Sequence, residues 1–77
     1  MTAIEYDNAM EAIYEGKAIT KETYEKLSLL AAQCGANAKH LMKQGRKTEA
    51  WWFKDNRSEI RQALARALVL EPECESI

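Results

Sequence analysis

The sequence contains few of the residues that break helices or that form disulfides and metal sites. Its 77 residues include one proline, three glycines, two cysteines and one histidine. The stretch from Ile19 to Val69 contains no proline, the residue that most strongly disrupts a helix interior. The composition, 47% apolar and 30% charged, is typical of a globular chain rather than a disordered one.

Long apolar runs are absent as well. No run approaches the roughly 18 residues that a membrane-spanning helix requires. The first residues include the acids Glu5 and Asp7, where a secretory signal needs bases followed by an apolar segment. We therefore predict a cytoplasmic protein that does not associate with membranes. A chain this short forms one core, so residues 1–77 are expected to be a single small domain.

The side chains of metal and catalytic sites are also scarce. Cys34 and Cys74 are forty residues apart and His40 is the single histidine, so no metal-ligand spacing occurs. No carboxylate is placed to make His40 a general base. We expect Cys34 to be a small buried residue and Cys74 an exposed thiol, with no disulfide between them. The sequence predicts no metal, no cofactor and no enzymatic activity.

Helix start and stop signals divide the chain into segments. Thr2 and Glu5 form a capping-box pattern at the start of a first helix, which Gly16 is placed to end. Thr20 is a good N-cap for a second helix, which we expect to end near Gly45. No segment alternates between apolar and polar residues over a useful length, so we predict no sheet. The predicted fold class is all-α, with three or four helices dominated by an antiparallel hairpin.

The second helix carries an apolar seam with the alternating three-and-four spacing of a coiled coil. Its centre consists of small residues, which allow another helix to approach closely. We expect this seam to pair with a second copy of the chain as a helical-hairpin dimer. Gly35, inside the segment, marks either a break or a close contact. The predicted self-association seam comprises Tyr24, Leu27, Ala31, Cys34, Ala38 and Leu41.

The last helix has several possible boundaries. Thr48 or a neighbour is expected to cap its start. Asn56 followed by Glu59 resembles a second capping box, which would allow a kink or a restart at that point. Pro72 is expected to end the helical part, and the acidic tail over residues 71–77 is expected to fray.

Charge is unevenly distributed although the net charge is −1. Residues 1–26 hold six acids and three bases, whereas residues 39–66 hold eight bases and three acids. Such segregation can attract an anionic partner or a second copy of the chain, and the alternative is a set of solvated helix faces. The possible contacts with an anionic partner are Lys39, Lys43, Arg46 and Lys47.

The two tryptophans are expected to differ in their surroundings. In a continuous helix, Trp52 falls in the core or at its edge, and Trp51 points away from the core stripe, beside Lys54 and Arg61. Tryptophan and arginine are enriched at the energetic centres of protein interfaces. The alternative is that Trp51 packs against another part of the chain. The predicted partner-binding residues are Trp51, Lys54, Arg57 and Arg61.

Three functions are compatible with these features. The leading hypothesis is a small protein-interaction module that acts as an inhibitor or adaptor of a larger protein, as accessory proteins of phages and other mobile elements often do. The first alternative is a nucleic-acid-binding regulator that uses the bases of residues 39–66, although dedicated binders usually have a pI above about 9 and this chain has one of 5.8. The second alternative is a structural subunit of a larger assembly. Because small cores often need reinforcement, we expect a homo-oligomer, with a dimer favoured.

Overall fold

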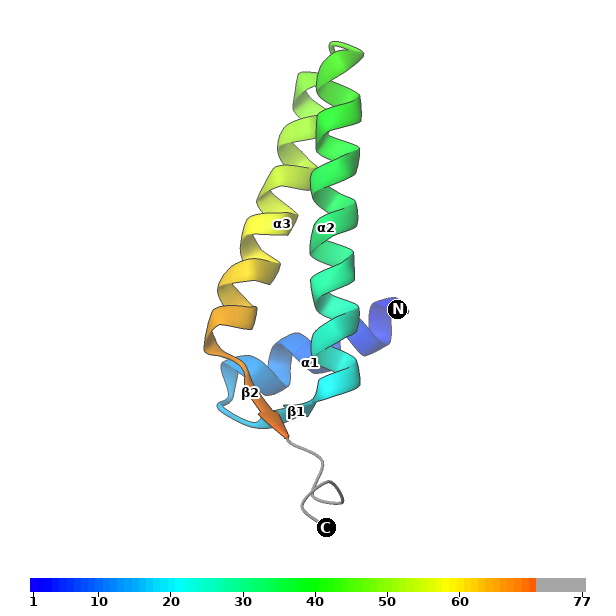
Figure 1. Ribbon diagram of the computed structural model, residues 1–77. Helices are drawn as coiled ribbons and strands as arrows, with labels where there is room; N and C mark the ends of the chain where they lie inside the picture. The colour runs from blue at the N-terminus through cyan, green and yellow to red at the C-terminus, as the bar shows by residue number, and fades with distance from the viewer. Residues whose placement is uncertain (71–77) are drawn as a thin grey trace.

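The computed structural model describes residues 1–70 and consists of three helices and two short strands (Figure 1). The helices are α1 (Ala3–Tyr14), α2 (Lys21–Lys43) and α3 (Lys47–Arg66), and the strands are β1 (Ala18–Thr20) and β2 (Leu68–Leu70). Helices α2 and α3 lie side by side as an antiparallel hairpin, and α1 crosses the end of the hairpin that lies away from its turn. The predicted all-α hairpin architecture is confirmed. The predicted exposed thiol and acidic tail lie outside the described residues.

The boundaries of α1 are those predicted from its capping residues. The Thr2 hydroxyl accepts a hydrogen bond from the Glu5 backbone N–H at 3.1 Å, and the Glu5 carboxylate accepts one from the Thr2 N–H at 3.0 Å. These bonds, first the one from the Thr2 backbone, together with the nearby charge of Lys26, hold the pKa of Glu5 below its ordinary value. The chain leaves the helix through Gly16, whose φ of 79° suits glycine.

Helix α2 begins and ends as predicted but passes unbroken through Gly35. The Thr20 hydroxyl accepts a hydrogen bond from the Thr23 N–H at 3.1 Å, and Gly45, with φ of 78°, follows the last turn. Between them the helix is continuous over 23 residues. Of the two alternatives for Gly35, the structure therefore shows the close contact rather than the break.

The start of α3 differs from the prediction, and its middle decides between the alternatives left open at Asn56. Arg46, not Thr48, occupies the N-cap position, and it makes no side-chain capping bond. Its guanidinium instead pairs with Glu49 one turn into the helix, with Nη2 and Oε1 2.7 Å apart. Asn56 does not restart the helix, because its side-chain amide donates to the Trp52 carbonyl oxygen at 3.0 Å within a continuous α3.

The prediction of no sheet is wrong for two three-residue segments. Strands β1 and β2 pair in parallel, with Ala18 opposite Leu68 and Thr20 opposite Leu70. One strand leads into α2 and the other leaves α3, so the antiparallel hairpin brings them together at one end of the molecule. Three residues are too few to give a recognisable alternation in the sequence, which explains why the pattern does not reveal them.

The core lies where the small-residue seam of α2 meets α3 and α1. Leu27 and Ile60, at 0% and 1% exposure, are its largest fully buried side chains. Cys34 is buried as predicted, and this burial raises the pKa of its thiol. The central members of the predicted self-association seam are thus covered by the chain's own helices, so pairing through them would require the hairpin to open. The buried members are Leu27, Ala31, Cys34 and Ala38.

No helix within residues 1–70 has the length and apolar character to cross a membrane.

Candidate partner-binding groove

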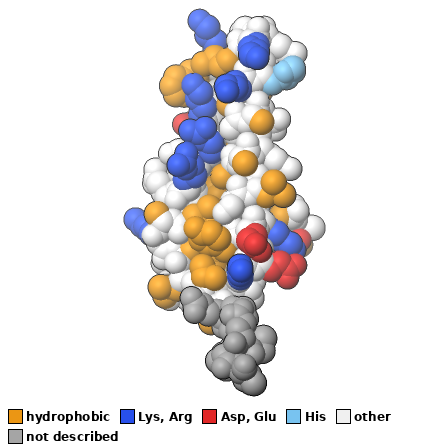
Figure 2. Space-filling model, in the orientation of Figure 1, with side chains coloured by type: hydrophobic (Ala, Val, Ile, Leu, Met, Phe, Trp, Pro, Cys, Tyr) orange, Lys and Arg blue, Asp and Glu red, His pale blue; other side chains and the backbone are white. Residues whose placement is uncertain are grey.

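The surface between α2 and α3 is hollowed on the face where basic side chains gather. On this face, most of the visible Lys and Arg side chains lie over the half of the hairpin nearer its turn, and most visible Asp and Glu lie toward the other end (Figure 2). Two hollows, of about 310 and 490 Å³, follow the line between the helices. Both are bordered by Arg57, and we call them together the basic groove. The first is lined by Ser28, Ala31, Ala32, Arg57, Arg61 and Leu64, and the second by Gly35, Ala36, Ala38, Lys39, Met42, Lys54 and Arg57.

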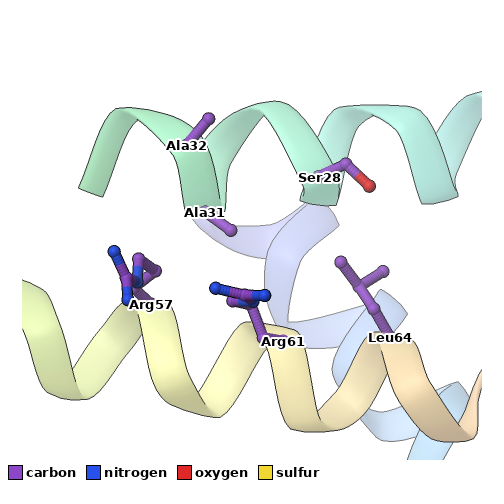
Figure 3. Close-up of a pocket in the computed structure, with 6 residues that line it drawn as sticks. All are labelled: Ser28, Ala31, Ala32, Arg57, Arg61 and Leu64. Carbon is purple, nitrogen blue, oxygen red and sulfur yellow. The ribbon is translucent and has the colours of Figure 1, made fainter. Parts of the chain in front are cut away.

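The floor of the groove is formed by small residues of α2. Because alanine and glycine have small side chains or none, long side chains from α3 can lie directly across the α2 backbone. Arg57 and Arg61 extend from α3 toward α2 over this floor (Figure 3). The approach is closest at Gly35, where an added Cβ would lie 3.1 Å from both Cδ and Nη1 of Arg57. Gly35 therefore makes room for the Arg57 side chain.

The four residues predicted to bind a partner form a continuous line on α3. Lys54 places its Nζ 5.0 Å from the ring centroid of Trp51, a cation–π contact, and also lines the groove. Arg57 and Arg61 continue the line one and two turns further on. Trp51 is 56% exposed and lies beside Lys54, outside the lining of the groove itself. The structure thus brings the predicted set together on one side of α3.

The four bases assigned to an anionic partner divide into two groups. Lys39 lines the groove from α2, opposite Lys54. Lys43, Arg46 and Lys47 lie around the hairpin turn, outside the groove lining. Arg46 is also engaged with Glu49. Of this set, only Lys39 lines the same hollow as Lys54 and Arg57 of α3.

The bases of the groove lack acidic partners within the described chain. Among residues 1–70, ion pairs with N···O distances of 4.0 Å or less involve Lys17, Lys26 and Arg46. No carboxylate in that part of the chain pairs with the groove bases. The groove therefore concentrates positive charge that the described residues leave uncompensated. The bases concerned are Lys39, Lys54, Arg57 and Arg61.

Trp52 lies elsewhere than predicted. Its side chain is 62% exposed, so its expected position in the core is wrong. It packs edge-on against Phe53, with centroids 4.9 Å apart and planes at 81°, and borders a separate apolar hollow of about 290 Å³. The beginning of α1, around Tyr6, also lines this hollow. Residues from all three helices line this hollow, so their proximity could not be predicted from their spacing along the sequence.

Two titratable side chains outside the groove, His40 and Tyr6, have contacts or surroundings that the structure specifies. Nε2 of His40 lies 3.1 Å from the Gln44 side-chain nitrogen, at the exposed end of α2. Desolvation, followed by the charge of Glu59, raises the pKa of Tyr6. Within residues 1–70 no group of three or more His, Cys, Asp or Glu side chains is placed to hold a metal ion.

The arrangement of the groove is suited to binding an anionic group. Arginine and lysine donate charge-assisted hydrogen bonds to carboxylates and phosphates, and the small residues beneath them leave room for a ligand. The chain matches no protein-family model, curated protein or solved structure.

Proposed function

We propose that this protein is a non-enzymatic interaction module whose basic groove binds an acidic segment of a larger protein. The observation that carries the proposal is the set of four bases without carboxylate partners in residues 1–70, bordering a groove floored by alanine and glycine. Binding in the groove would let the protein inhibit its target or connect it to another protein. This role agrees with that of the small accessory proteins of phages and other mobile elements.

The spacing of the arginines specifies the kind of segment that would fit. Arg57 and Arg61 are separated by one helical turn, about 6 Å along the axis. Two carboxylates at a similar spacing, as at positions i and i+4 of a helix, could each meet one guanidinium. Trp51 at the end of the line offers a large apolar surface of the type that anchors protein interfaces. The proposed ligand is therefore an acidic segment that also carries an apolar side chain.

Nucleic acid is the second candidate, because the same bases could contact phosphates. The acidic residues in the rest of the chain favour a short acidic protein segment over nucleic acid as the ligand. The net charge is −1, and six acids lie within residues 1–26, toward the α1 end of the hairpin. An extended polyanion that followed the hairpin would meet these acids, whereas a short acidic segment would occupy the groove alone.

A structural role in a larger assembly is the third candidate, and unfolding of the isolated chain distinguishes it. A protein whose apolar surface is covered only inside an assembly would, when isolated, unfold without cooperativity or aggregate. The buried contacts among α1, α2 and α3 favour a chain that folds by itself. Thermal unfolding should therefore be cooperative.

The experiment is an affinity capture from host-type lysate, with and without nuclease, read by mass spectrometry. The Arg57→Ala/Arg61→Ala variant is compared with the wild type, and Lys21→Ala removes an exposed base at the start of α2 as a control. We expect one protein to be retained in both nuclease arms by the wild type and by the control, and lost by the groove variant. Capture that disappears with nuclease would instead favour nucleic acid as the ligand.

A further inference from the structure

Arg57 and Arg61 share one hollow of the basic groove. They lie one helical turn apart on α3, and both border the hollow of about 310 Å³ with their side chains extended toward α2 (Figure 3). No carboxylate among residues 1–70 lies within 4.0 Å of either guanidinium. Like charges at this spacing on a helix repel each other. The hollow therefore gathers two positive charges that the described chain does not compensate.

The remaining walls of this hollow supply space and a further donor. Ala31 and Ala32 have small side chains, so α2 does not fill the space beneath the two arginines. Ser28 on α2 contributes a hydroxyl, which can donate a hydrogen bond. The side chains that line the hollow within residues 1–70 include no carboxylate. The lining therefore suits a small group that carries several acceptor oxygens and more than one negative charge.

We propose that this hollow binds the phosphate group of a phosphorylated serine or threonine in the target protein. The inference rests on the proposed function, because it names the group through which the acidic segment is recognised. A phosphorylated side chain carries a charge of about −1.5 to −2 near pH 7 and three strong acceptor oxygens. Arginine binds phosphate through paired, parallel hydrogen bonds. A single modified residue thus supplies the charge that Arg57 and Arg61 together lack.

Carboxylates match this hollow less well than phosphate does. One carboxylate carries a single charge and would leave one of the two arginines uncompensated. Two glutamates one turn apart would supply both charges, but fixing two long side chains costs more conformational entropy than fixing one phosphorylated serine. The target should therefore bind more tightly when it is phosphorylated. Its carboxylates should contribute at the second hollow of the groove, which Lys39 and Lys54 line.

Nucleic acid offers the same oxygens with less charge on each phosphate. A phosphate of a nucleic acid is a diester with one negative charge, whereas a phosphorylated side chain is a monoester with a charge near −2. The two arginines of the hollow therefore favour the monoester. A small diester used as a probe separates these two sources of phosphate.

A conservative variant separates the guanidinium groups from their charge. Arg57→Lys/Arg61→Lys keeps both positive charges and removes the planar, paired donors. Both side chains are exposed, so circular dichroism should show unchanged helicity. The variant should bind phosphoserine and glutamate about equally, because the preference for phosphate comes from the paired donors. A preference that survives in the variant would overturn the assignment of Arg57 and Arg61 as the phosphate-binding residues.

The measurement is a ¹H–¹⁵N NMR titration of the full-length wild type and variant. In the wild type it is read at the side-chain Nε–Hε signals of Arg57 and Arg61, and in the variant at the backbone signals of the same positions. The probes are phosphoserine and glutamate, each blocked at both ends, and dimethyl phosphate, so that no flanking sequence contributes. We expect phosphoserine to shift both wild-type signals saturably, with an affinity at least about tenfold above that of either other probe.

The outcomes of this titration separate the phosphate inference from the proposed function. Equal affinity of the wild type for glutamate would overturn the phosphate inference and leave the binding of an acidic segment intact. Equal affinity for dimethyl phosphate would overturn it in favour of nucleic acid. The absence of any shift with phosphoserine would also overturn it, whereas the proposed function is tested independently by the lysate capture.

Discussion

Two groups of exposed bases, those near α1 and those of the basic groove, differ in their acidic partners. Near α1, Lys26 lies 3.5 Å from both Glu5 and Glu22, and Lys17 lies 3.0 Å from Glu15. In the basic groove the bases have no such partners among residues 1–70. Exposed ion pairs contribute little to stability, so the difference matters mainly for what the surface can bind. Lys17 and Lys26 near α1 are therefore paired within the chain, whereas the bases of the groove are not paired within residues 1–70.

The largest expected effect comes from removing the aromatic and basic ends of the line on α3. Trp51→Ala/Arg61→Ala should weaken capture of the target at least about 100-fold, because interface anchors of these types each contribute about 2 kcal/mol or more. Helicity should be unchanged, since both side chains are exposed. The measurement is titration of the captured target, with Lys21→Ala as the control. Undiminished binding would remove this surface from consideration.

A smaller effect is expected from Gly35→Ala, which separates binding from stability. The new methyl group would displace Arg57 across the groove, and we expect target affinity to fall about tenfold. Because Arg57 is exposed and can move, the helix should keep the gain of up to about 1 kcal/mol that alanine has over glycine. Denaturant unfolding and target titration measure the two quantities. A joint loss of stability and affinity would show that Arg57 cannot move aside.

Removing an ion-paired base near α1 should lower stability slightly and leave target affinity unchanged. Lys26→Ala removes contacts to both Glu5 and Glu22, and the free energy of unfolding should fall by less than about 1 kcal/mol, since all three side chains are substantially exposed. Target affinity should be unchanged. Arg61→Ala is the matched comparison, with affinity lost and stability retained. An affinity loss in Lys26→Ala equal to that in Arg61→Ala would break the distinction between the paired bases and the groove bases.

The smallest effect is a pH dependence at the start of α1. The pKa of Glu5 is lowered from 4.5 in the folded chain, so its ionised form stabilises the fold at pH values above about 4.5. That contribution should disappear as the pH falls through the lower folded pKa. The difference in unfolding free energy between the wild type and Glu5→Gln should therefore be constant near neutral pH and shrink in acid. A difference that grows in acid would contradict the assigned role of the carboxylate.

Local chemistry made much of the fold predictable. Caps and glycine stops act within a few residues, so Thr2, Thr20 and Gly45 identify helix ends directly from the sequence. The small-residue seam likewise indicates a close helix neighbour. The sequence does not determine whether that neighbour is α3 or another copy, because both would satisfy the same spacing.

The features that were not predicted depend on long-range proximity. The strands pair because the start of α2 and the end of α3 lie at the same end of the hairpin, and the hollow beside Trp52 is lined by residues of all three helices. The predicted line on α3 could be drawn from helical periodicity alone. Its relation to Gly35 and Lys39 required the packing of α2 against α3.

The most direct test of the central claim is a ¹H–¹⁵N NMR titration of the full-length chain with a defined acidic peptide. The peptide is helical, with glutamates at i and i+4 and one adjacent leucine, and a lysine-for-glutamate version is the control. We predict shift changes at Gly35, Arg57 and the Trp51 indole with the acidic peptide and none with the control. Changes that instead centre on α1, or that the two peptides share, would contradict the assignment of the basic groove as the binding site.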